Sequence, residues 1–86
     1  SMKVYVLYYI YNNTVEDMYE ILGVYKTLKD AQQVMSVDST EFEQQIKEYK
    51  IKGFNEESTK IEDEKYISIT GFDAYIEWVI EEFDLQ

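Results

Sequence analysis

The sequence contains no histidine, cysteine, arginine or proline, and only three glycines. The absence of cysteine excludes disulfide bonds and thiolate metal sites and is typical of a reducing compartment, so we expect a cytoplasmic protein. Without histidine or cysteine, the chain lacks the usual proton shuttle and the most reactive nucleophile. No phosphate-binding glycine loop or serine nucleophile motif occurs either. We therefore expect a protein that is not an enzyme and holds no cofactor; catalysis by paired carboxylates is the least favoured alternative.

Long hydrophobic runs are also missing. The longest, 4–11, has eight residues, whereas a helix needs about 20 apolar residues to cross a bilayer. Because 45% of the chain is nevertheless apolar, we expect one folded domain over residues 1–86 and no membrane association. Ser1, which precedes Met2, is interpreted as a remnant of expression.

Positive charge is scarce, since 8 lysines face 18 acidic residues and the net charge is −10. Residues 1–40 hold five acids and three lysines, and residues 41–86 hold thirteen acids and five lysines. Such a surface repels nucleic acid and anionic membranes and attracts basic partners. We therefore expect no direct binding of nucleic acid, and we expect a partner with a basic surface.

The first half of the chain predicts a β-hairpin followed by a helix. Residues 4–11 and 19–25 are rich in β-branched and aromatic residues, and an Asn-Asn turn follows the first run. Thr27 and Asp30 form a capping box, which predicts a helix over about 28–36.

The second half is predicted to contain further elements in sequence. Asp38-Ser39-Thr40-Glu41 repeats a helix-start signal, so a second helix near 42–48 is predicted, although part of it fits a strand; a strand follows at 49–52. The acidic stretch 55–64 predicts a mobile loop, 66–70 a strand, and the spacing of apolar residues in 72–84 an amphipathic helix. The predicted fold class is α+β: a small antiparallel sheet of about four strands covered by an amphipathic C-terminal helix.

The acids of the predicted terminal helix form the first candidate partner-binding site. On a helix they would lie on one face, with steps of about 6 Å that approach the spacing of phosphates in a nucleic acid. We therefore weigh mimicry of nucleic acid against the simpler interpretation that an acidic face keeps the protein soluble. Trp78 lies at the flank of the apolar stripe, where it is either an exposed anchor for a basic side chain or a residue packed at the core edge. The candidate set is Asp73, Glu77, Trp78, Glu81 and Asp84.

Two further groups complete the candidate residues. The acids of the predicted loop extend the acidic surface, but their spacing matches no calcium loop, so no metal site is expected; they are Glu56, Glu57, Glu62, Asp63 and Glu64. One face of the first predicted strand carries Tyr5, Tyr9 and Tyr11. This tyrosine face is the basis of the alternative function, a self-associating structural module, so the chain is expected to be a monomer or a homodimer.

A resemblance adds to these expectations. Val4-Tyr5-Val6-Leu7-Tyr8, followed by Leu22-Gly23-Val24-Tyr25-Lys26-Thr27 and Asp30-Ala31, resembles the opening of small uncharacterised ββα domains of phages and mobile elements of low-GC Gram-positive bacteria. The resemblance covers about residues 4–36 and carries no catalytic residues. The acidic, tyrosine-rich character of the chain is also similar to that of phage anti-defence proteins, such as anti-CRISPR inhibitors that mimic nucleic acid. It implies an inhibitor that acts in a bacterial host on a nucleic-acid-binding protein such as a defence nuclease.

Overall fold

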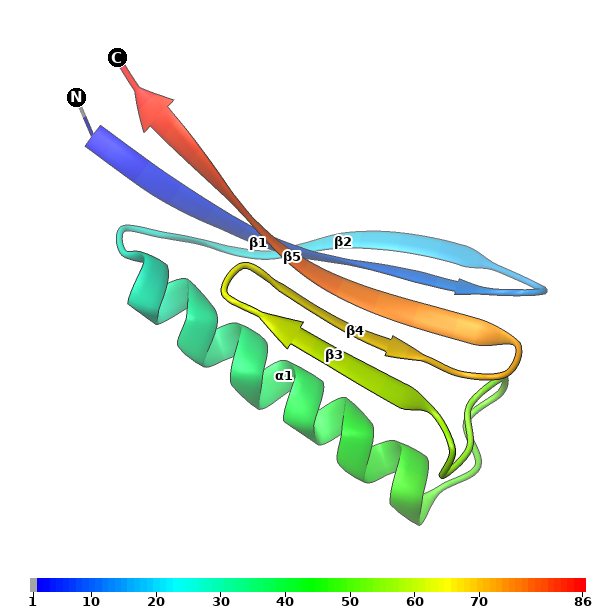
Figure 1. Cartoon of the computed structure of the whole chain (residues 1–86). Helices are drawn as coiled ribbons and strands as arrows, with labels where there is room; N and C mark the ends of the chain where they lie inside the picture. Colours follow the sequence, from blue (N-terminus) through cyan, green and yellow to red (C-terminus); the bar gives the residue numbers. More distant parts are fainter. Residues whose placement is uncertain (1) are drawn as a thin grey trace.

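The chain folds into a five-stranded antiparallel sheet with one helix on one of its faces (Figure 1). A computed structural model describes residues 2–86, and the interpretation of Ser1 concerns a residue outside that range. The elements are, in order, β1 (Met2–Asn13), β2 (Asp17–Tyr25), α1 (Leu28–Glu48), β3 (Thr59–Asp63), β4 (Tyr66–Thr70) and β5 (Ala74–Leu85).

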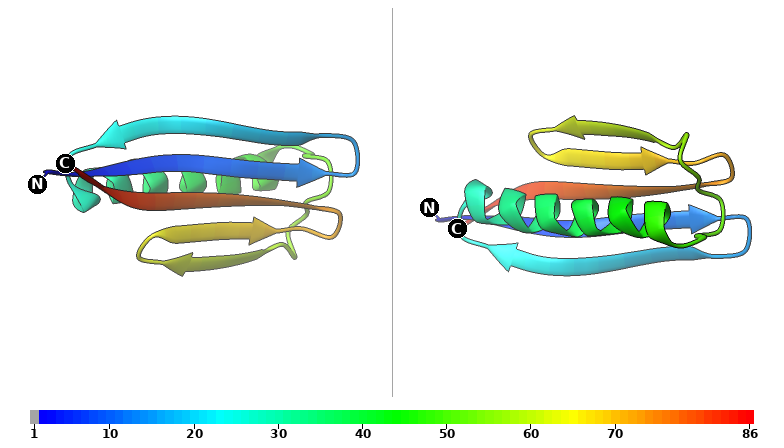
Figure 2. Two further views of the ribbon diagram at one scale, coloured as in Figure 1. Left: turned by 90° about the horizontal axis from the view of Figure 1, so that it is seen from above. Right: turned by 90° about the horizontal axis from the view of Figure 1, so that it is seen from below.

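The two longest strands, β1 and β5, lie side by side at the centre of the sheet, whose order is β2-β1-β5-β4-β3. They pair along their whole length, from Met2 opposite Leu85 to Asn13 opposite Ala74. Figure 2 shows α1 crossing one face of this sheet while the opposite face carries no other element. In the part of the chain that the structure describes, α1 is too polar to cross a membrane.

The predicted C-terminal helix over 72–84 is wrong, and with it the predicted four-stranded fold: the segment forms β5, and the only helix of residues 2–86 lies in the middle of the chain. The spacing of the apolar residues in 72–84 fits both the 3.6-residue period of a helix and the two-residue period of a strand. Ile76, Trp78 and Ile80 alternate on one face of β5 and are buried, whereas Tyr75 and Val79 lie on the other face. Pairing with both β1 and β4 selects the two-residue period.

The helix that the structure contains begins where the capping box predicts and continues further than expected. Thr27 is the N-cap, and its Oγ1 accepts a hydrogen bond from the backbone N–H of Asp30 at 3.1 Å. The second start signal does not interrupt α1, because the Ser39 hydroxyl is buried and donates back to the carbonyl of Ser36. The helical prediction for 42–48 is confirmed as the last two turns of the same helix.

Two predictions for the segment after α1 are wrong. The predicted strand at 49–52 is not formed, since α1 ends at Glu48 and a turn with Gly53 at a φ of 86° follows. The predicted loop at 55–64 contains β3, which pairs with β4 from Thr59 opposite Thr70 to Asp63 opposite Tyr66. Because an edge strand needs few apolar residues, the sequence of β3 has the polar composition that is typical of a loop. The strands predicted at 4–11, 19–25 and 66–70 are confirmed.

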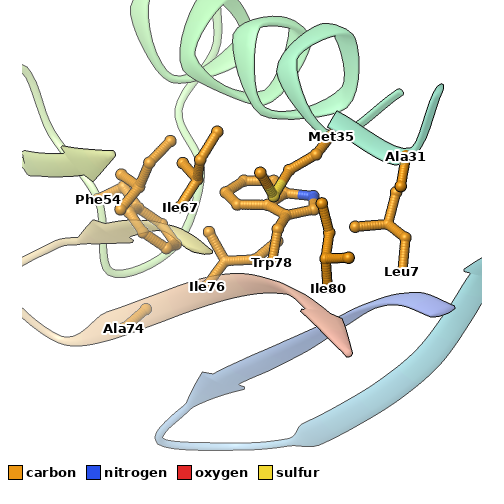
Figure 3. Packing of buried hydrophobic residues seen from close by; sticks show 10 residues of the cluster. Leu7, Ala31, Met35, Phe54, Ile67, Ala74, Ile76, Trp78 and Ile80 are labelled. Carbon is orange, nitrogen blue, oxygen red and sulfur yellow. The ribbon is translucent and has the colours of Figure 1, made fainter. Parts of the chain in front are cut away.

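The hydrophobic core fills the space between α1 and the sheet (Figure 3). Trp78 on β5 has no exposed surface and lies beside Met35 of α1, and Leu7 of β1 is equally buried next to Ala31. Phe54, from the segment after α1, closes the core at one end and stacks edge-on against Phe42 at 5.2 Å. The core therefore covers only the face of the sheet that points toward α1.

Candidate functional site

The face of the sheet that points away from α1 has no covering element. Because side chains alternate along a strand, each residue between two core positions points to this side. We call this surface the open face. Its positions are Met2, Val4, Val6, Tyr8, Ile10 and Asn12 on β1, Asp17, Tyr19, Ile21 and Val24 on β2, Tyr75, Glu77, Val79, Glu81, Phe83 and Leu85 on β5, Tyr66, Ser68 and Thr70 on β4, and Thr59, Ile61 and Asp63 on β3.

Apolar and aromatic side chains dominate the open face. Tyr19 and Val24 on β2 are 63% and 61% exposed, and Phe83 on β5 is 45% exposed. The ring of Tyr8 stacks on that of Tyr19 at a centroid distance of 5.0 Å. Exposed apolar side chains that lie together in this way are typical of an interaction surface.

The acids of the open face are held by tyrosine hydroxyls. The Tyr8 hydroxyl donates to Glu81 at 2.7 Å, and the Tyr66 hydroxyl donates to Glu77. These hydrogen bonds, together with partial burial, raise the pKa of Tyr8 to about 12 and raise that of Tyr66 as well, because a phenolate beside a carboxylate is disfavoured. The two carboxylates are therefore fixed in position on an apolar surface.

No lysine occupies an open-face position on the five strands. Lys3 and Lys60 lie on strands but at positions that face α1, and the other lysines belong to α1, turns and loops. Lys3 forms an ion pair with Glu82, which raises the pKa of Lys3 and lowers that of Glu82, on the opposite side of the sheet. The open face thus carries charge of one sign only, from Asp17, Asp63, Glu77 and Glu81.

The four acids of the predicted carboxylate row do not lie on one surface. Glu77 and Glu81 share the open face, whereas Asp84 lies at a position of β5 that faces the helix side and Asp73 lies in the turn before β5. On a strand, a four-residue step spans about 13 Å, not the 6 Å of a helix. The expected match to the spacing of phosphates is therefore wrong.

Trp78 and the three predicted interface tyrosines face α1. Trp78 is fully buried and its indole N–H donates to the Asp38 carboxylate at 2.7 Å, so the interpretation as an exposed anchor is wrong and the packed alternative is confirmed. Tyr5, Tyr9 and Tyr11 point to the α1 side of the sheet and are partly buried against the core, and self-association through them stays a prediction.

The acids of the predicted loop are spread over several places. Glu56 and Glu57 precede β3, Glu62 and Asp63 lie on opposite faces of β3, and Glu64 belongs to the turn before β4. Only Asp63 joins the open face, where it lies opposite Tyr66.

A second concave site, which the sequence did not reveal, lies between α1 and β2. We call this cavity of about 520 Å³ the α1–β2 groove. Four aromatic residues contribute to its walls, and four acidic residues line it without any lysine. The aromatic residues are Tyr9, Tyr11, Phe42 and Trp78, and the acidic ones are Glu16, Glu20, Asp38 and Glu41. These side chains come from β1, the turn before β2, β2, α1 and β5, so no local sequence pattern predicts their meeting.

No family model, no curated protein and no solved structure matches this chain. The resemblance to phage and mobile-element domains stays a prediction.

Proposed function

We propose that this chain is a non-enzymatic protein-binding module whose open face docks on a basic surface of another protein. The observation that carries the proposal is the composition of that face: exposed apolar and aromatic side chains, fixed carboxylates, and no lysine. Burial of the apolar side chains supplies the favourable free energy. The carboxylates select a partner of opposite charge and exclude one of the same charge.

The same composition disfavours a second copy of the chain as the partner. A symmetric dimer through the open face would bury Asp17, Asp63, Glu77 and Glu81 of both copies in one interface that contains no lysine. Like charges that lose water without a counter-charge cost free energy. The open face therefore favours a different, basic protein over self-association.

Proteins that bind nucleic acids carry such basic surfaces, because they neutralise phosphates with lysine and arginine. A bacterial nuclease of host defence is one partner of this kind. The support for this choice is the sign of the charge alone, since the spacing of Glu77 and Glu81 on a strand does not reproduce a phosphate backbone.

The test compares capture of proteins from a bacterial lysate by three forms of the immobilised chain. The variant Glu77→Lys/Glu81→Lys reverses two open-face charges, and the control Glu56→Lys/Glu57→Lys makes the same charge change in the loop before β3. We expect a basic protein that the wild type and the control retain at low salt, that high salt or added DNA releases, and that the open-face variant loses. Equal retention by both variants, or recovery of nothing but the chain itself, contradicts the proposal.

A further inference from the structure

The α1–β2 groove runs beside a free strand edge. One side of β2 pairs with β1, and within residues 2–86 no strand pairs with its other side. Met18, Glu20 and Leu22 of β2 line the groove, so the groove and the free edge belong to the same strand. A segment that pairs with β2 therefore has side chains that point directly into the groove.

The edge of β2 is only partly protected against pairing, since it has a bulge and one inward-pointing charge, Glu20. Natural edge strands are shortened, carry lysine, proline or inward-pointing charges, or are twisted away by bulges. The other edge of the sheet, β3, follows this rule, since it has five residues and three of them are charged. β2 has nine residues without lysine or proline.

An irregularity limits the usable part of this edge. The register between β1 and β2 shifts between Leu7 and Tyr8, which leaves Leu22 as an extra residue on β2. Such a bulge interrupts a regular edge. The regular part that remains beside the groove is Asp17–Ile21, and a strand of about five residues fits it.

The walls of the groove favour a cationic side chain. The partly exposed rings of Tyr9, Tyr11 and Phe42 form an aromatic wall, and Phe42 packs edge-on against the buried Trp78 at 5.9 Å. Aromatic faces attract guanidinium and ammonium groups. The aromatic wall by itself would also accept a neutral apolar side chain. The four carboxylates that line the groove favour a cationic side chain instead.

Two of the groove carboxylates are already oriented. Glu20 accepts a hydrogen bond from the Tyr9 hydroxyl at 2.7 Å, and Asp38 accepts one from the Trp78 indole at 2.7 Å. Each carboxylate keeps further acceptor positions, because its two oxygens offer about four in all. Glu16 and Glu41 are exposed at the rim of the same groove.

We propose that an extended segment of a partner protein adds to Asp17–Ile21 of β2 and inserts an arginine or lysine side chain into the α1–β2 groove. Main-chain hydrogen bonds hold the added strand, and the groove selects the residue, as in other cases of strand addition. Its neighbours in the strand point to the other side and extend the apolar open face. The preferred segment therefore alternates apolar, basic and apolar residues.

This proposal does not depend on docking at the open face, because it uses the free backbone edge of β2 and the groove carboxylates, not the open-face carboxylates Glu77 and Glu81. A second copy of this chain is a poor occupant of the edge, since pairing two β2 strands would place Glu16 and Glu20 of both copies near each other. Nucleic acid and acidic segments are excluded by the charge of the groove.

The test uses a blocked pentapeptide, acetyl-Thr-Val-Arg-Val-Thr-amide, and the same peptide with citrulline in place of arginine. Citrulline keeps the shape of the side chain and removes its charge. We expect the arginine peptide to bind about tenfold more tightly, the ratio that one charge-assisted hydrogen bond provides. In NMR titrations of the labelled chain, the amides of Asp17–Ile21 and the indole N–H of Trp78 should shift.

The variants Glu20→Gln and Glu41→Gln remove groove charges without changing shape, and each should weaken the arginine peptide about fivefold, as for loss of one ionic partner. Glu57→Gln is the matched control and should leave binding unchanged. Equal affinity for the two peptides, no binding at millimolar peptide, or shifts confined to the open face overturns the proposal. Binding that is lost in Glu77→Lys/Glu81→Lys but kept in Glu20→Gln also overturns it while leaving the proposed function intact.

Discussion

Trp78 links β5 to α1 in the core. Its indole is enclosed between α1 and the sheet, it packs edge-on against Phe42, and its N–H is satisfied by Asp38 of α1. A buried tryptophan needs such a partner, because an unpaired N–H in the core costs free energy. The position of one side chain therefore ties β5 to the helix.

Replacing Trp78 by phenylalanine should lower the free energy of unfolding by about 2 kcal/mol, since it removes buried atoms and leaves the Asp38 carboxylate without its donor. Denaturant unfolding followed by circular dichroism measures this change. Asp38→Asn keeps an oxygen acceptor for the indole and should lower the free energy of unfolding by less than half as much as Trp78→Phe. An unchanged stability of Trp78→Phe would contradict the role given to this residue.

Two tyrosines should ionise late in an alkaline titration. Hydrogen bonds to Glu81 and Glu20, followed by partial burial, raise the pKa values of Tyr8 and Tyr9 to about 12 from 10.0. The native state favours the neutral phenols, so their contribution to stability is complete below pH 10.0 and is lost as the pH rises toward about 12.

The absorbance of tyrosinate should therefore rise in more than one step, and the last step should shrink in Tyr8→Phe and in Tyr9→Phe. The free energy of unfolding of the wild type should fall across the same range of pH. A single step for all nine tyrosines near their ordinary pKa would contradict the hydrogen bonds described.

At the scale of elements, β1, β2, β4 and the start of α1 could be predicted because their signals are local. The long β-rich run 4–11 and the capping box at Thr27 need no distant partner to be recognised. Segment 72–84 could not be assigned from spacing alone, because its apolar residues fit periods of two and of 3.6. Its β-branched and aromatic composition was the signal that favoured a strand, and pairing with β1 and β4 determines the outcome.

The connection between α1 and β3 depends on Gly53. Its φ of 86° is unfavourable for other residues, and an added Cβ would lie 2.9 Å from the backbone of Asp73. We expect Gly53→Ala to lower the free energy of unfolding by about 1–3 kcal/mol. Gly23→Ala is the control, because its Cβ would meet only the Tyr25 side chain, and should cost less than about 1 kcal/mol or stabilise. Equal effects in thermal or denaturant unfolding would show that the left-handed conformation is not required.

At the scale of the molecule, one helix covers one face of a five-stranded sheet and leaves the other face to a partner. Of the predicted site, Glu77, Glu81 and Asp63 remain together on the open face. The apolar side chains around them could not be predicted, because the wrong element assignments placed Glu77 and Glu81 on a solvated helix and Asp63 in a mobile loop. The α1–β2 groove was missed because four separate elements build it.

The charge of the open face makes a prediction about assembly. Sedimentation velocity at high micromolar concentration and low salt should show a monomer, because two open faces repel each other. A stable dimer that dissociates in the variant Phe83→Ser, and not in the control Tyr49→Ser outside the sheet, would instead establish self-association through the open face.

The most direct test of the central claim is hydroxyl-radical footprinting of the chain alone and in complex with the basic protein it captures. Tyr19 and Phe83 represent the open face, and Tyr49 and Phe72, which are 67% and 72% exposed outside the strands, serve as internal controls. The account predicts that the partner protects Tyr19 and Phe83 while the two controls keep their reactivity. Protection of Tyr49 and Phe72 with unchanged reactivity of Tyr19 and Phe83 would contradict docking through the open face.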